Sequence, residues 1–448
     1  MRLKRKAQPA GAIGHWLVAL PLALTGASAV AQDTGSSLGA GGLAVDTSPY
    51  YLGASQTFTH ESNAYRVPFG ASDTYSTTTL LAGFDQPISR QRFFGTASVG
   101  VNRYFNESQL NNTSYDLATG VDWSTIWRLA GNVTATLDQR LVAPTATVAA
   151  PVSTRNLEKR QSISGLARWG GDAAISLEGR LGYSAVDYSA PAYVASESNN
   201  ETGSFGVFYR PGSQTRVGLA VRVDRTRTPQ AIRLDDGSYQ SNETRGRNLD
   251  LLGEYNNGSN ITASGRLSLT RQRNSSVNNA DFSGLTGGVN LGYRATGKLA
   301  FNLAASRDAG FNSTTGAYVR TAVVPVSVGP ASPTTIDSSR SLYENNQVTN
   351  SVSAGVSYAA TSKIGVGLNA RYSRARLITS AAASTSASQA RPDVVDKTRG
   401  ASLTANYAFS RVWSFACSLA SDRREVAGAY GYGYTDNVAS CSARFLWR

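Results

Sequence analysis

The fold is decided by the stretch Ala401–Phe409, ASLTANYAF, and by two related runs, Trp413–Ala420 (WSFACSLA) and Ala439–Trp447 (ASCSARFLW). In each run every second residue is apolar or aromatic, and the residues between them, apart from Leu446, are small, polar or charged. A period of two puts the two sets on opposite faces of a β-strand. These runs therefore predict strands with one oily face and one polar face.

The same alternation begins near Tyr50 and continues to the end of the chain in about eighteen segments. The connections between segments alternate in length. Short turns such as Asn257–Ser259 follow one segment, and long polar connections such as Thr228–Glu243, Gly310–Asn346 and Leu377–Lys397 follow the next. Bacterial outer-membrane barrels have this asymmetry, with short periplasmic turns and long external loops.

We therefore predict an all-β protein, a single transmembrane antiparallel up-and-down β-barrel of about 18 strands, with short periplasmic turns and long extracellular loops. The alternative is a soluble β-sandwich, whose strands also alternate but whose connections have no reason to alternate in length. Tryptophans near strand ends (Trp123, Trp127, Trp169, Trp413 and Trp447) are typical of the aromatic girdles at membrane interfaces.

The N-terminus has the features of a secretory leader. It is basic from Arg2 to Lys6, then apolar, and Ala29-Val30-Ala31 matches a small-x-small cleavage site. We expect a cleaved signal peptide at residues 1–31, a flexible periplasmic segment at residues 32–47 and the barrel at residues 48–448. An uncleaved membrane anchor is the alternative for residues 1–31.

The chain is basic, with 43 Lys and Arg against 30 Asp and Glu. Loss of the leader leaves a net charge of +9, carried almost entirely by arginine. A lipid-facing arginine near the bilayer midplane costs about 2–4 kcal/mol. Charged residues that share the parity of the polar residues are therefore expected to face the lumen. This set is Arg92, Arg168, Arg180, Arg216, Arg222, Arg266, Arg371, Arg444, Asp122, Glu178 and Asp224.

These lumen charges have two interpretations. The acids pair with the arginines and brace the wall, or the lumen has a net positive field that attracts polyanions. The sequence is compatible with both interpretations.

Two cysteines flank the last external loop. If Arg424 pairs with Tyr434, Cys417 lies directly opposite Cys441, which predicts a cross-strand disulfide. Two free thiols are the alternative. His60 is the only histidine after the leader, and no His/Cys cluster suits zinc. We therefore expect no catalytic site, no metal, no cofactor and no nucleic-acid partner.

The segment Gln86-Pro87-Ile88-Ser89-Arg90-Gln91-Arg92-Phe93, with Asn102-Arg103-Tyr104 and Tyr115-Asp116-Leu117, resembles the EpsL-type outer-membrane β-barrels of exopolysaccharide operons, which often accompany exosortases. The layout is also similar to that of alginate-export porins. One departure is the last residue, Arg448, since outer-membrane proteins usually end in an aromatic residue. The resemblance implies export of a secreted polysaccharide across the outer membrane.

The expected function is thus a porin-like conduit in the bacterial outer membrane that exports an anionic or partly charged exopolysaccharide without chemistry, with Gly310–Asn346 as a candidate gate. Expected partners are the polymer, outer-membrane lipid, the barrel-assembly machinery and periplasmic or inner-membrane export components. A diffusion porin for small solutes or anions is the main alternative. A barrel enzyme is another, and would need His60 with a serine near the outer rim.

Overall fold

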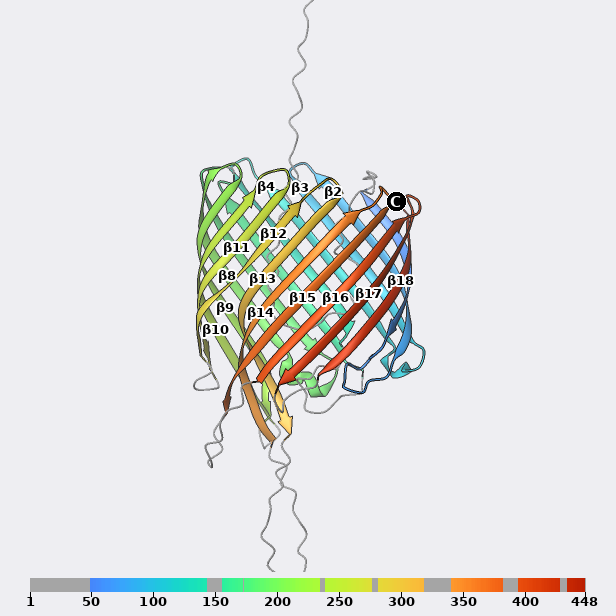
Figure 1. Cartoon of the computed structure of the whole chain (residues 1–448). Coiled ribbons are helices and arrows are strands. Elements are labelled where there is room, and N and C mark those ends of the chain that lie inside the picture. Colours follow the sequence, from blue (N-terminus) through green and yellow to red (C-terminus); the bar gives the residue numbers. More distant parts are fainter. Residues whose placement is uncertain are drawn as a thin grey trace, which may run out of the picture.

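A computed structural model describes residues 49–142, 155–171, 173–233, 238–275, 281–317, 340–381, 394–427 and 433–447. It confirms a closed antiparallel barrel of 18 strands (Figure 1). The strands are β1 (Tyr50–Glu61), β2 (Asp73–Ile88), β3 (Gln91–Tyr104), β4 (Asn112–Ser124), β5 (Leu129–Leu141), β6 (Leu157–Trp169), β7 (Ile175–Tyr188), β8 (Ser198–Gly212), β9 (Thr215–Arg233), β10 (Tyr239–Asn256), β11 (Ile261–Asn274), β12 (Phe282–Arg294), β13 (Leu299–Ala317), β14 (Arg340–Ala359), β15 (Ile364–Ala381), β16 (Val394–Ala408), β17 (Trp413–Ala427) and β18 (Tyr434–Trp447). The segments expected to be the leader and the periplasmic lead-in lie outside the described residues.

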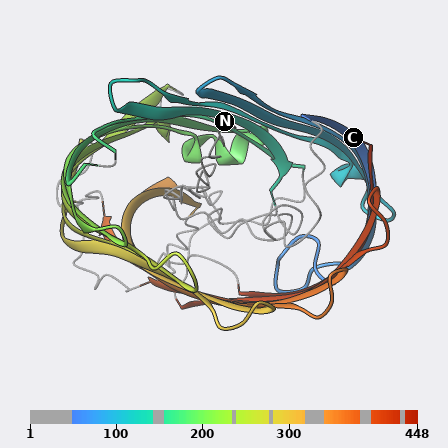
Figure 2. The same cartoon turned by 90° about the horizontal axis from the view of Figure 1, so that it is seen from above.

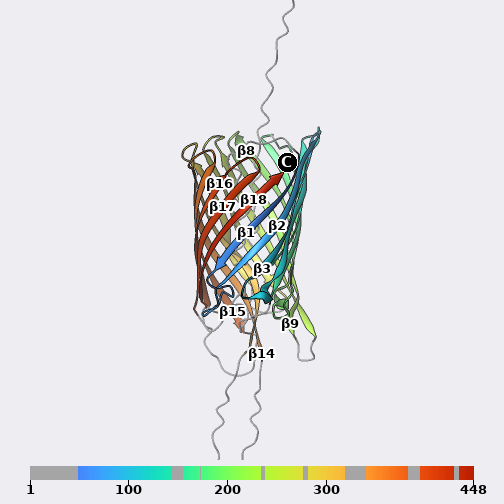
Figure 3. The same cartoon turned by 90° about the vertical axis from the view of Figure 1, so that its right-hand side faces the viewer.

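Each strand pairs with the next along the chain, and β1 closes the barrel against β18. That closing seam runs over ten consecutive positions, from Leu52 opposite Trp447 to Glu61 opposite Val438. Closure leaves no unpaired strand edge, which a lipid environment requires because it offers the backbone no hydrogen-bond partner. The cross-section is an ellipse rather than a circle, as the view from above and the narrower side view show (Figures 2 and 3).

The outer wall is an apolar band. On β11 the outward residues are Ile261, Ala263, Gly265, Leu267 and Leu269, and the next outward residue is Arg271. The ten-residue rise from Ile261 to Arg271 is about 33 Å along the strand, and a tilt of about 40° reduces it to about 25 Å, the height of a membrane-spanning band. The chain is therefore an integral protein of the bacterial outer membrane, where barrels of this form occur.

Exposed aromatic residues form a girdle at the end of the barrel where the short turns and the C-terminal strand end lie. It includes Trp127, Trp169, Trp413 and Trp447. Glycine supports two of these turns, since Gly170 and Gly258 have φ of 78° and 73°, where other residues are strained. Among the described residues no helix is long and apolar enough to cross a membrane.

The long connections are shorter than the sequence predicts. The prediction of a loop over Gly310–Asn346 is partly wrong, because β13 continues to Ala317 and β14 begins at Arg340. The segment between them lies outside the described residues. Similarly, β15 extends to Ala381 and β16 begins at Val394. Polar residues beyond the bilayer can pair as a hairpin or form a loop, so their polarity does not distinguish the two.

Cys417 and Cys441 are joined by a disulfide between β17 and β18, with Cα atoms 4.1 Å apart. The register matches the expected hairpin, with Arg424 opposite Tyr434 and Cys417 opposite Cys441. Both cysteines are on the outward face.

We predict that the double variant Cys417→Ala/Cys441→Ala unfolds more easily, because it loses a cross-link that closes a loop of about 24 residues. The expected loss is about 3 kcal/mol, measured by urea unfolding in detergent micelles. Reductant should shift the wild type to the same midpoint and leave the double variant unchanged. A wild-type midpoint that is insensitive to reductant would contradict the role of this bond.

Candidate functional site

The inward face of the barrel is the candidate site. In every strand the exposed Leu, Val and Phe residues share one parity, which marks the outward face. The residues of the other parity face the lumen. All eleven predicted lumen residues lie on the inward face.

Glu178 is the centre of a charge cluster close to the short-turn end of β7. It accepts hydrogen bonds from Nε of Arg168 at 2.9 Å and Nε of Arg180 at 2.7 Å. Arg216, two strands away on β9, donates a third at 2.8 Å and stacks 3.7 Å from the ring of Phe208. The Glu178 side chain is only 2% exposed. One buried carboxylate therefore holds three arginines from three strands.

A second cluster lies on β9 and β10. Arg222 donates to Asp224 at 2.7 Å and to Asp250 at 2.9 Å. Asn248 donates to the same Asp224 carboxylate at 2.6 Å. Three further predicted arginines also have acidic partners: Arg92 with Asp85 and Asp122, Arg266 with Asp308, and Arg371 with Asp422. Pairing of this kind braces the wall.

One inward charge cluster was not predicted from the sequence. Arg140 and Arg160 both donate to Glu158, at 2.7 and 2.9 Å, and Tyr188 donates to its second oxygen at 3.0 Å. Arg140, Arg160 and Glu158 alternate in step with Asp138, an inward residue of β5, and this alternation could have identified them from the sequence. They lie next to the connection between β5 and β6, where the end of each strand is hard to place from alternation alone.

The paired positions of the inward face are nearly balanced in charge. They carry twelve arginines: Arg92, Arg140, Arg160, Arg168, Arg180, Arg216, Arg222, Arg266, Arg294, Arg371, Arg424 and Arg444. They carry fifteen acids: Glu61, Asp73, Asp85, Asp116, Asp122, Asp138, Glu158, Glu178, Asp224, Asp250, Glu254, Asp308, Asp396, Asp422 and Asp436. The net charge of these positions is −3.

The positive charge lies on the outside instead. Among the paired positions whose side chains the structure describes, the outward ones carry fourteen basic residues: Arg103, Lys159, Arg225, Arg227, Arg245, Arg247, Arg271, Arg273, Arg307, Arg374, Arg376, Lys397, Arg399 and Arg423. They carry four acids, Asp187, Glu201, Glu243 and Glu425, for a net charge of +10. The described wall therefore lacks the net positive lumen field considered above. The energetic cost of a lipid-facing arginine applies only inside the apolar band. These outward basic residues lie beyond the band, toward the long-loop end.

The long-loop mouth is narrowed by the connection between β1 and β2, which lies inside the ring in the view from above (Figure 2). Ala64 packs in a small hydrophobic cluster with the inward rings of Tyr75 and Tyr104, which stack 4.6 Å apart. Tyr65 donates to Glu107 at 2.7 Å. Burial, with this hydrogen bond, raises the pKa of Tyr65 to about 12, so the phenol keeps its proton at neutral pH.

A short 3-10 helix, η2 (Pro191–Ser196), also narrows this mouth. It lies against β7, β9 and β13, and Tyr193 in it is 3% exposed. The sequence analysis placed a gate at Gly310–Asn346. The described parts of that segment are paired strands, and the described segments that narrow the opening are the β1–β2 connection and η2.

His60 lies on the outward face near the end of β1. Its Nδ1 is 3.0 Å from Oγ1 of Thr74, and the described chain shows no serine or carboxylate bonded to the ring. No group of three or more His, Cys, Asp or Glu side chains within the described ranges is arranged to hold a metal ion.

No family model matches the chain, and no curated protein matches it. The fold is similar to Pseudomonas aeruginosa OccK1 (OpdK), with 10% identity, 89% of this chain and 99% of that chain covered, and a TM-score of 0.44. It is also similar to OpdL (12%, 89%, 99%, 0.41) and OccK3, or OpdO (11%, 91%, 98%, 0.43), from the same organism.

We predict that Glu178→Gln destabilises the barrel, because it leaves three converging arginines without their shared counter-charge. Loss of one partner of a buried pair costs about 3–5 kcal/mol. Since Arg168 and Arg180 are 27% and 35% exposed, we expect about 1–3 kcal/mol after solvent screening. Urea unfolding in micelles measures this, with Glu254→Gln as control.

The control residue also faces Arg216, at 3.4 Å, but its side chain is 52% exposed. It should therefore lose less than about 1 kcal/mol. Equal losses in the two variants would show that the Glu178 cluster does not brace the wall.

Proposed function

We propose that the chain is a water-filled outer-membrane channel through which small hydrophilic solutes diffuse. The observation that carries this proposal is the closed 18-strand wall with a charged and polar inward face. Barrels of 16–18 strands are wide enough to leave an aqueous channel between their side chains. The described loop and helix at one mouth narrow this path.

The paired charges determine how the wall treats ions. Arginines held by carboxylates present fixed dipoles rather than a field of one sign, so they attract neither anions nor cations strongly. The inward excess of acids is small. We therefore propose weak cation preference, and not the anion selectivity that the overall basic composition suggests.

Export of an exopolysaccharide is a second candidate. It is supported by the resemblance of the Gln86–Phe93 region to polysaccharide-operon barrels and by an inward set of uncharged hydrogen-bonding groups. On β2–β4, Asn102 accepts from Thr77 at 2.7 Å and donates to Asn112 at 2.9 Å. Hydroxyl and amide groups exchange hydrogen bonds readily with sugar hydroxyls, so this wall suits a polymer with little charge. Periplasmic export components would then deliver the polymer.

We predict steady, ohmic single-channel currents from the purified barrel in planar bilayers, with a reversal potential close to zero in a KCl gradient. Arg444 is exposed, faces the lumen and has no ion-pair partner among the described residues. Arg444→Glu should therefore shift the reversal potential toward cation selectivity without loss of stability. Arg374→Glu, on the outer wall, is the matched control and should leave it unchanged. A barrel that carries no current would contradict the channel proposal.

A deletion strain separates the two candidates. If the barrel exports a polymer, deletion should trap polysaccharide in the periplasm, and the wild-type gene should restore its secretion. If it is a diffusion channel, secretion continues and uptake of small polar solutes slows. Normal secretion in the deletion strain would exclude the export role.

A further inference from the structure

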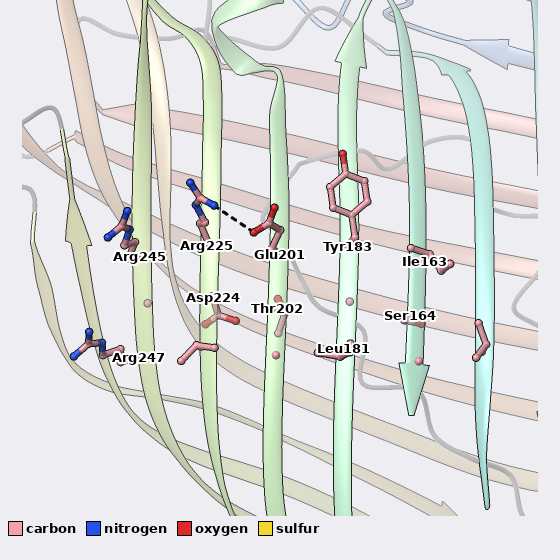
Figure 4. A pocket seen from close by; sticks show the side chains of 16 residues that line it. Ile163, Ser164, Leu181, Tyr183, Glu201, Thr202, Asp224, Arg225, Arg245 and Arg247 are labelled. Atoms are coloured by element: carbon pink, nitrogen blue, oxygen red, sulfur yellow. Dashed lines mark ion pairs between the residues drawn. The ribbon is translucent and has the colours of Figure 1, made fainter. Parts of the chain in front are cut away.

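A shallow groove of about 640 Å³ runs across the outer wall on β5–β10 (Figure 4). Directly opposed outward residues form its floor in the order Val133, Gly165, Leu181, Gly203 and Val223. The two glycines leave the hollow, because a Cβ at either position would meet its neighbours only at 3.6–4.0 Å. The groove is therefore apolar and open to the lipid.

Arginines close one end of the groove. The next opposed residues after Val223 are Arg247 on β10 and Arg271 on β11. The row above continues from Tyr183 through Glu201 to Arg225, Arg245 and Arg273. Figure 4 shows Tyr183, Glu201, Arg225 and Arg245 side by side on neighbouring strands.

These arginines face one another with little compensation. Arg245 is directly opposite both Arg225 and Arg273, and Arg247 is directly opposite Arg271. Like charges at opposed positions destabilise a sheet. Glu243 holds Arg225 at 2.8 Å and also binds Arg245. Arg247, Arg271 and Arg273 are exposed and have no ion pair or side-chain hydrogen bond with any other described residue.

The position of these arginines along the membrane normal places the patch that they form at a lipid headgroup layer. Arg271 is the first outward residue beyond the apolar band of β11, on the long-loop side, and the aromatic girdle marks the opposite interface. On the long-loop side, which faces outward in these barrels, the headgroups belong to the outer leaflet. Guanidinium groups bind phosphate through paired N–H donors, and do so most strongly where water is partly excluded.

We propose that this surface binds a phosphorylated glycolipid of the outer leaflet, the lipid A part of lipopolysaccharide, with phosphates on the arginines and an acyl chain along the groove. Three adjacent strands span about 10 Å, so the arginines form a broad patch in two rows. A disaccharide with a phosphate at each end can bridge such a patch, whereas a glycerophospholipid offers one phosphate. The proposal depends on the outer-membrane location and not on what passes through the lumen.

The test is native mass spectrometry of the full-length mature barrel in detergent, titrated with bisphosphorylated lipid A, dephosphorylated lipid A or phosphatidylglycerol. We expect the bisphosphorylated form to bind at least tenfold more tightly than either of the others. Arg247→Ser/Arg271→Ser/Arg273→Ser should lose at least tenfold of that affinity. Gly165→Leu/Gly203→Leu fills the hollow and should weaken the same lipid with every arginine in place.

The matched control is Arg90→Ser/Arg128→Ser/Arg411→Ser, which removes the same charge from exposed positions in the turns at the short-turn end. It should bind lipid A as the wild type does. Equal affinity of the outer-patch variant and the wild type, an equal loss in the control, or equal binding of phosphatidylglycerol would overturn the proposal. If the triple variant does not fold, Arg271→Glu alone replaces it and must still weaken binding.

Channel currents are recorded on the same preparations. The outer-patch variant should conduct as the wild type does, since its changes lie outside the wall. Loss of lipid binding with normal currents supports this site. Absence of current with normal lipid binding would refute only the channel role.

Discussion

The structure depends on one constraint, that every backbone N–H and C=O inside a bilayer must find its partner in the chain itself. A sheet meets this condition only when its first and last strands pair, and here β1 pairs with β18 over ten positions. Closure then gives the alternating residues two different surroundings, lipid and lumen. A shift of one residue in any strand would exchange them. The faces, the apolar band and the polar lumen all follow from this.

The same division between lipid and lumen determines where charged residues lie, but its effect inside the apolar band differs from its effect above the band. Within the band, arginines can only face inward, and there nearly every one meets a carboxylate, as around Glu178. A paired wall resists distortion and has little net field. Above the band water and headgroups can solvate a guanidinium, so arginine can face outward without the midplane cost. The basic character of the chain is therefore directed at the membrane surface and not at the lumen, which changes the kind of solute the channel is expected to favour.

The two mouths differ because their connections differ. At the short-turn end tight turns return the chain at once and leave the opening clear of described segments. At the other end the connection after β1 folds inward onto Tyr75 and Tyr104, and η2 packs against strands from different parts of the wall. The narrowing of the path is thus built from segments that follow the strands, so it can change in evolution while the wall stays the same.

Alternation along the whole chain, together with connections that alternate in length, was enough to predict the barrel and its strand number. Parity within one strand predicted the lumen side of residues such as Arg180 and Arg371, and the register of one hairpin predicted the Cys417–Cys441 bond. The contacts of Glu178 with Arg216, the opposed arginines of β9–β11 and the inward fold of residues 62–72 were decided only by the tertiary structure. These contacts join strands that are not consecutive, or depend on register across several strands. Register is set jointly by the tilt and closure of the whole sheet, and no single stretch of sequence contains that information.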